Sequence, residues 1–127
     1  MPRAVLLGLL ACAVLASDQP QTLRGRLRQP AGKPPVIETP AGKSYTVSGD
    51  QFTTAQMSDP KLRDREMELE GRFASGSHFE AAKIFTLKDG KRHKATYWCD
   101  ICSIRTHMPG LCMCCQADTE LQELPAP

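Results

Sequence analysis

The sequence predicts a mainly β protein, in which a small barrel of short strands is followed by a compact cysteine-rich segment. Apolar and polar residues alternate in several short runs between residues 22 and 98, and this period of two is typical of half-buried strands. Glycine, proline and aspartate residues separate the runs, as tight turns require. Five of the six cysteines then fall within residues 97–116.

Residues 1–16 have the pattern of an export signal. Arg3 supplies a positive charge, residues 4–16 are apolar and uncharged, and a polar stretch follows, which is the order of a secretory signal peptide. The apolar run is shorter than the roughly 20 residues that a membrane-spanning helix needs. Two alternatives are a buried N-terminal helix and a bacterial lipobox that would attach a lipid to Cys12. The expected location is therefore periplasmic or secreted.

The length and charge of the chain that remains after such a cleavage limit the functions that can be expected. About 110 residues form one domain with at most a small appendage. A domain of this size buries a modest core, so a metal ion or a disulfide would add needed stability. Without Arg3 the sequence has 15 basic and 14 acidic residues. This near-neutral balance gives no indication of a nucleic-acid partner or of an anionic membrane surface.

The barrel is expected within residues 17–96. Six strands are predicted, at residues 22–28, 36–39, 44–47, 65–70, 78–87 and 91–98. Residues 49–64 carry few large apolar side chains and are expected to form a connection with one helical turn near residues 53–57. Residues 71–77 are expected as a loop, and Asp89-Gly90 is a strong hairpin signal.

The first five of these strands lie within about 70 residues, three before the connector and two after it. This order resembles the OB-fold, a small Greek-key barrel. In that fold the first and fourth strands are antiparallel neighbours. Here they carry charges of opposite sign at the same period, and opposed pairs of this kind stabilise a sheet by roughly 0.2–1 kcal/mol each. The charged residues are Arg24, Arg26 and Arg28 on the first strand and Glu66, Glu68 and Glu70 on the fourth.

A nucleic-acid surface is the alternative use of the three arginines. Such a surface combines a basic groove with aromatic side chains on which bases stack. The available aromatic residues, Tyr45, Phe52, Phe73 and Phe79, have no dense basic patch among them. The sequence therefore favours the cross-strand ladder.

Four cysteines form two C-x2-C pairs separated by nine residues, Cys99/Cys102 and Cys112/Cys115. Two such pairs in tandem are typical of a zinc ribbon. Two residues between the thiolates allow a tight turn to point both sulfurs at one ion, about 2.3 Å away. Pro109-Gly110 can reverse the chain between the pairs. Four thiolates without an open position predict a closed, structural zinc site in residues 97–118, followed by a flexible tail over residues 119–127.

Other ligand sets remain open. Cys114 could replace Cys115 as the fourth ligand, and a C-x-C chelate with Cys112 is also possible. Met108 and Met113 lie nearby, and thioethers together with thiolates suit copper(I). His107 could occupy one coordination position.

The segment also resembles a named family, the heavy-metal-binding domain of periplasmic metal efflux proteins. In that family Tyr-x-Cys-Pro-Met-His is followed by Pro-Gly-x-Cys-Pro-x-Cys-Gly-Met. The matching residues here are Tyr97, Cys99, Pro109, Gly110, Cys112 and Cys115, while Cys102 stands where the family has histidine. The resemblance covers about 20 residues and implies a bound transition metal.

Disulfide formation by these cysteines is the alternative to metal binding, because cysteines of exported proteins normally form disulfides. Five cysteines cannot all pair with one another. The expected function is a non-enzymatic, exported protein that binds zinc and contacts an unidentified envelope or secreted protein. The alternatives are a thiol–disulfide redox or sensing protein that uses Cys112, Cys114 and Cys115, and an OB-type oligosaccharide binder.

Overall fold

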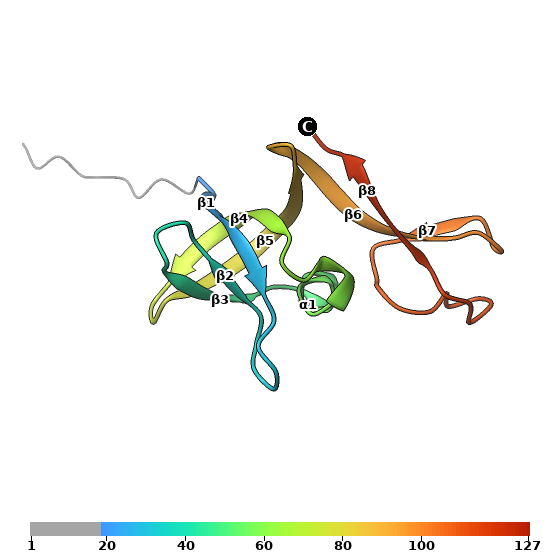
Figure 1. Ribbon diagram of the computed structural model, residues 1–127, viewed down its shortest axis with the longest axis horizontal. Helices are drawn as coiled ribbons and strands as arrows, with labels where there is room; N and C mark the ends of the chain where they lie inside the picture. The colour runs from blue at the N-terminus through green and yellow to red at the C-terminus, as the bar shows by residue number, and fades with distance from the viewer. Residues whose placement is uncertain (1–18) are drawn as a thin grey trace, which may run out of the picture.

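A computed structural model describes residues 19–127, so the expected signal peptide and Cys12 lie outside the described residues. The described chain is mainly β with one short α-helix, as the sequence predicts (Figure 1). No helix in this part of the chain is long and apolar enough to span a bilayer. The elements are β1 (Gln21–Arg28), β2 (Val36–Glu38), β3 (Ser44–Ser48), α1 (Gln51–Met57), the 3₁₀ helix η1 (Pro60–Leu62), β4 (Glu66–Ala74), β5 (His78–Lys88), β6 (Lys91–Cys99), β7 (Ile104–Thr106) and β8 (Glu120–Pro125).

Five strands form a partial ring. They follow one another in the order β3-β2-β1-β4-β5, and β3 also pairs with β5. The β3–β5 pairing is parallel, whereas the other pairings of the ring are antiparallel. α1 and η1 lie in the connection between β3 and β4, where the sequence predicts a connector with a helical turn.

The core lies inside the ring because one face of each strand is apolar. On β1 the period-two pattern turns Leu23 and Leu27 inward, and on β4 it does the same for Met67 and Leu69. Burial of such a side chain stabilises the fold by roughly 1.5–3 kcal/mol. The other large buried apolar side chains of this core are Ile37, Val47, Met57, Leu62, Phe79 and Ile84.

The predicted charge ladder between β1 and β4 is present for two pairs. Arg24 lies opposite Glu68 and Arg26 opposite Glu66 in the strand register. Their side chains form ion pairs of 2.7 Å and 2.8 Å. The Arg26 pair is exposed on both sides and contributes little, whereas Glu68 is buried and depends on its partners. The arginines of β1 thus have a structural role.

Arg28 and Glu70, the remaining charged residues of the two strands, take no part in the ladder. Arg26 already pairs with the first residue of β4, so Arg28 extends past the end of that strand. It binds Asp64 in the preceding turn instead, at 2.6 Å. Glu70 pairs with Arg92 of β6 at 2.8 Å.

Residues 71–77, expected as a loop, are a loop only in part, because β4 continues to Ala74 and pairs with β5 along its whole length. The prediction failed because the strand continues through a glycine and a β-bulge. The register between the two strands skips Ala82, which faces no residue of β4. Gly71 is required at this point, since a Cβ there would lie 1.9 Å from the carbonyl oxygen of Glu80.

We expect Gly71→Ala to destabilise the protein by about 1–3 kcal/mol, because the added methyl group must displace backbone rather than a flexible side chain. Urea-induced unfolding followed by tryptophan fluorescence would measure the change. Ser75→Ala, in the exposed turn between the same strands, should change the free energy of unfolding by less than about 0.5 kcal/mol. Equal stability of the two variants would contradict the steric explanation.

The same sheet continues beyond the ring through β6, which pairs with β5 next to their hairpin. β7 pairs with the end of β6, and β8 pairs with residues 93–98 of the same strand. These three strands, the β6–β8 part of the sheet, include residues that the sequence assigns to the barrel. The flexible tail predicted for residues 119–127 is wrong for Glu120–Pro125, which forms β8. Figure 1 shows α1 between the ring and the β6–β8 part of the sheet.

The pairing of β8 depends on contacts that are distant in sequence. Leu121 packs against the hydrophobic core, and the side chain of Glu123 is only 5% exposed. That carboxylate lies 3.4 Å from Arg65 and 3.6 Å from Lys88. Because these partners come from elements far away in the chain, the sequence near residue 120 shows no strong strand signal of its own.

Candidate metal centre

The β6–β8 part of the sheet brings the two cysteine pairs together. Cys99 is the last residue of β6, and Cys102 follows in the turn that leads into β7. Cys112 and Cys115 lie in the loop between β7 and β8. The Sγ atoms of all four residues lie within 4.8 Å of one another, and those of Cys99 and Cys115 are 3.5 Å apart. Thiolates placed tetrahedrally around zinc, each at about 2.3 Å, are about 3.8 Å from one another, so the cluster has the size of such a site.

The two cysteine pairs lie in two separate turns that have the same backbone conformation. The residue directly after the second cysteine of each pair, Ser103 or Gln116, has a positive φ, of 53° and 63° respectively. This conformation is uncommon for residues other than glycine, and here it recurs at equivalent positions. In the first turn the N–H of Cys102 donates to Sγ of Cys99 at 3.4 Å. The backbone therefore aims the sulfurs of each pair toward a common point.

Hydrogen bonds within the second turn favour a thiolate at Cys112. The backbone N–H groups of Cys115 and Cys114 lower the pKa of Cys112 to about 6, because N–H donors stabilise the charged sulfur. Hydrogen bonding with Cys115 and burial raise the pKa of Cys102 to about 12. At Cys99 the N–H of Cys102 lowers the pKa, but burial and hydrogen bonds with other cysteines outweigh it, and the pKa is raised.

These pKa shifts predict a steep pH dependence of metal affinity. Near pH 7 the thiols of Cys99 and Cys102 carry protons in the metal-free protein, whereas Cys112 is ionised. Zinc binds thiolates, so binding releases at least these two protons. We expect the apparent zinc affinity to fall at least about 100-fold when the pH is lowered from 8 to 7. Competition with a chromophoric chelator at each pH would measure it, and a constant affinity would contradict this assignment.

The other predicted ligands do not join the cluster. Cys114 is exposed and is not among the four grouped sulfurs, so the geometry selects Cys115 as the fourth residue. The side chain of Met113 is 84% exposed. His107 lines a separate cleft and is not among the grouped residues. All five cysteines of residues 19–127 are free thiols.

The connector between β3 and β4 supports the cysteine cluster, a role that the sequence did not reveal. The hydroxyl of Tyr97, two residues before Cys99, donates to Asp59 at 2.5 Å. Burial and this hydrogen bond raise the pKa of Tyr97 well above its usual range, so the phenol remains a donor. Tyr97 is fully buried and Asp59 nearly so. The pair ties the cysteine-bearing strand to the ring.

Two further hydrogen bonds reach from the connector to the loop that carries the second cysteine pair. The amide of Gln56 donates to the carbonyl oxygen of His107 at 2.6 Å. The ammonium group of Lys61 donates to the carbonyl oxygen of Thr119 at 3.0 Å, and the Thr119 hydroxyl donates to Gly110 at 2.6 Å. Buried polar residues in a connector, such as Gln56 and Asp59, are the signal that could have indicated this support.

The metal centre thus consists of four cysteine sulfurs, held by two equivalent turns and braced by the connector of the barrel. Four cysteines so placed can hold one metal ion. Comparisons of the chain with protein-family models, with curated proteins and with solved structures find no match.

Proposed function

We propose that this is an exported, non-enzymatic binding protein in which Cys99, Cys102, Cys112 and Cys115 hold one zinc ion. The observation that carries the proposal is the grouping of the four sulfurs within 4.8 Å. A site with four protein thiolates leaves no position for water or substrate, so its ion is structural rather than catalytic. The signal-like pattern of residues 1–16 supports export, and the resemblance to heavy-metal-binding domains supports a transition metal.

Zinc fits the donor set better than copper(I). Four tetrahedral sulfurs are typical of zinc or of an iron–sulfur centre. Copper(I) is favoured by thioether ligands, but Met113 points to solvent and lies outside the cluster. The remaining thiol, Cys114, is exposed at the edge of the site.

An apolar patch on the cysteine-bearing turns supports a role in contacting another protein. Within residues 19–127 the large apolar side chains that are more than half exposed are Ile101, Leu111 and Met113, at 73%, 56% and 84%. All three flank the cysteines, so the metal would fix the shape of the surface that presents them. Apolar residues that gather on a surface mark interaction sites more often than single ones do. We propose that this patch contacts an envelope or secreted protein.

Native mass spectrometry of the mature protein, purified from an exporting host without reductant, tests the proposal. We expect one zinc per chain and no loss of mass from disulfides. A metal-free chain that is lighter by two or four hydrogens would show oxidised cysteines and would favour the redox alternative. Cys114→Ser is the matched control and should leave the zinc stoichiometry unchanged.

A further inference from the structure

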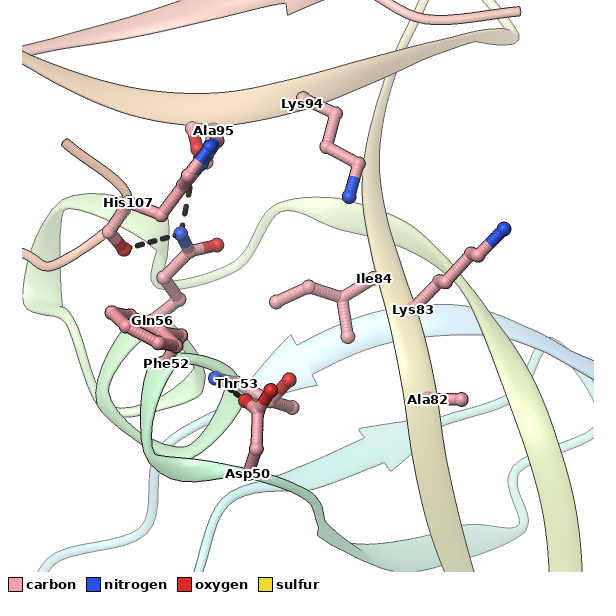
Figure 2. A pocket seen from close by; sticks show the side chains of 10 residues that line it. All are labelled: Asp50, Phe52, Thr53, Gln56, Ala82, Lys83, Ile84, Lys94, Ala95 and His107. Carbon is pink, nitrogen blue, oxygen red and sulfur yellow. Dashed lines mark hydrogen bonds between the residues drawn. The ribbon is translucent and has the colours of Figure 1, made fainter. Parts of the chain in front are cut away.

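A cleft of about 190 Å³ lies between α1, β5, β6 and the loop that follows β7 (Figure 2). Its volume is close to the roughly 150 Å³ of a cavity that holds one benzene molecule. Phe52 and Gln56 of α1 form one wall, and Ile84 of β5 and Ala95 of β6 lie against it. No residue of the cysteine cluster lines it, so its function can be tested separately from that of the metal centre.

The bulge in β5 shapes this cleft. The register between β4 and β5 skips Ala82, and the cleft is lined at this point by Ala82, Lys83 and Ile84. Figure 2 shows Ile84 pointing from β5 toward Phe52, whereas Lys83 extends from the other side of the strand, as expected for consecutive residues. Bulges of this kind occur preferentially next to binding sites.

The rim of the cleft is positively charged. Lys83 and Lys94 are exposed, and within residues 19–127 neither forms an ion pair. Lys88, on the same strand as Lys83, is paired with Glu123. Figure 2 shows Lys94 extending from β6 toward Ile84, and its Nζ lies 5.3 Å from the centroid of the Phe85 ring.

The opposite wall holds one carboxylate, that of Asp50. Its Oδ1 accepts the backbone N–H of Thr53 at 2.8 Å, which caps α1. This hydrogen bond lowers the pKa of Asp50, so the carboxylate stays ionised and repels anions from that end. A bound anion is therefore directed toward the lysines. Between the two ends, Phe52 leaves 44% of its surface exposed to solvent, and a ligand could cover it.

We propose that this cleft binds a small organic anion with an apolar body. The apolar body lies between Phe52 and Ile84, and the anionic group faces the ammonium group of Lys94. A small apolar cavity with a few charged groups at one side is the usual form of such a site. The volume limits the body to about one aromatic ring or a short branched chain.

Phenylacetate is a suitable probe, and phenethylamine, which has the same ring and the opposite charge, is its control. We expect phenylacetate to shift the backbone amide resonances of Phe52, Ile84 and Lys94 in ¹H–¹⁵N NMR spectra of the zinc-loaded mature protein, with a Kd of about 1–10 mM. Phenethylamine and inorganic phosphate should leave them unchanged. Equal shifts from phenethylamine would exclude recognition of the anion, and equal shifts from phosphate would exclude recognition of the ring.

Lysine variants test which ammonium group the anion contacts. Lys94→Met keeps the apolar stem and should weaken phenylacetate binding about 2- to 5-fold, as expected for an exposed ion pair. Lys83→Met, whose side chain extends from the other side of β5, and Lys91→Met, at an exposed position of β6 outside the cleft, are the matched controls and should bind as the wild type does. An unchanged Kd in Lys94→Met, or no titration at about 10 mM phenylacetate, would overturn the proposal.

Discussion

Replacing Cys112 with serine is expected to abolish stoichiometric zinc binding and to unfold the sheet formed by β6, β7 and β8. Cys112 is 2% exposed, and its sulfur carries the lowest pKa resolved in the cluster. A serine hydroxyl stays protonated and cannot replace a thiolate. Structural zinc contributes about 10–16 kcal/mol to the folding of small zinc domains, so losing one of four ligands should lower the zinc affinity by at least about 1,000-fold.

Two measurements check this expectation. Chelator competition gives the affinity, and the amide resonances of residues 120–125 report whether β8 remains paired. Cys114→Ser changes the same atom two residues away at an exposed position, so it controls for general effects of substitution. Wild-type affinity in Cys112→Ser, or a comparable loss in Cys114→Ser, would show that the ligands have been assigned wrongly.

The second large effect is expected for Asp59→Ala, which removes the acceptor of the Tyr97 hydroxyl. A buried donor without a partner costs about 1–3 kcal/mol. Asp59 also caps η1 by accepting the N–H of Lys61 at 3.1 Å, and loss of a cap costs about 1 kcal/mol. The free energy of unfolding should therefore fall by about 2–4 kcal/mol in urea titrations of the zinc-loaded protein.

A double-mutant cycle separates the hydrogen bond from the cap. Tyr97→Phe should destabilise the wild type, but it should be neutral or stabilising in the Asp59→Ala background, because the hydroxyl has no partner there. Asp59→Asn keeps one acceptor oxygen, enough for either the Tyr97 hydroxyl or the N–H of Lys61 but not for both, and it should be milder than Asp59→Ala. Additive effects of the two substitutions would contradict a direct interaction between Asp59 and Tyr97.

The features that could be predicted from the sequence are those encoded locally. Alternation located the strands of the ring to within a few residues, because half-buried strands need a period of two. The same period in Arg24/Arg26 and Glu66/Glu68 predicted that β1 and β4 are neighbours, and the register confirms it. The spacing of the cysteines selected the four residues that the fold groups together.

The features that were missed depend on contacts between distant segments. β8 forms because β6 offers a free edge and because Arg65 and Lys88 pair with Glu123. The bulge at Ala82 follows from the close approach of Gly71 to β5. The sequence favoured Cys115 but left Cys114 open as a substitute. Backbone conformation favours Cys115, since the positive φ of Gln116 makes the second turn equivalent to the first.

Zinc K-edge X-ray absorption of the zinc-loaded mature protein tests the central claim most directly. We predict four sulfur neighbours at about 2.3 Å and no nitrogen or oxygen neighbour. The spectrum of Cys114→Ser should be the same as that of the wild type. A first shell with three or fewer sulfurs, or a change of that shell in Cys114→Ser, would contradict a closed site made by Cys99, Cys102, Cys112 and Cys115.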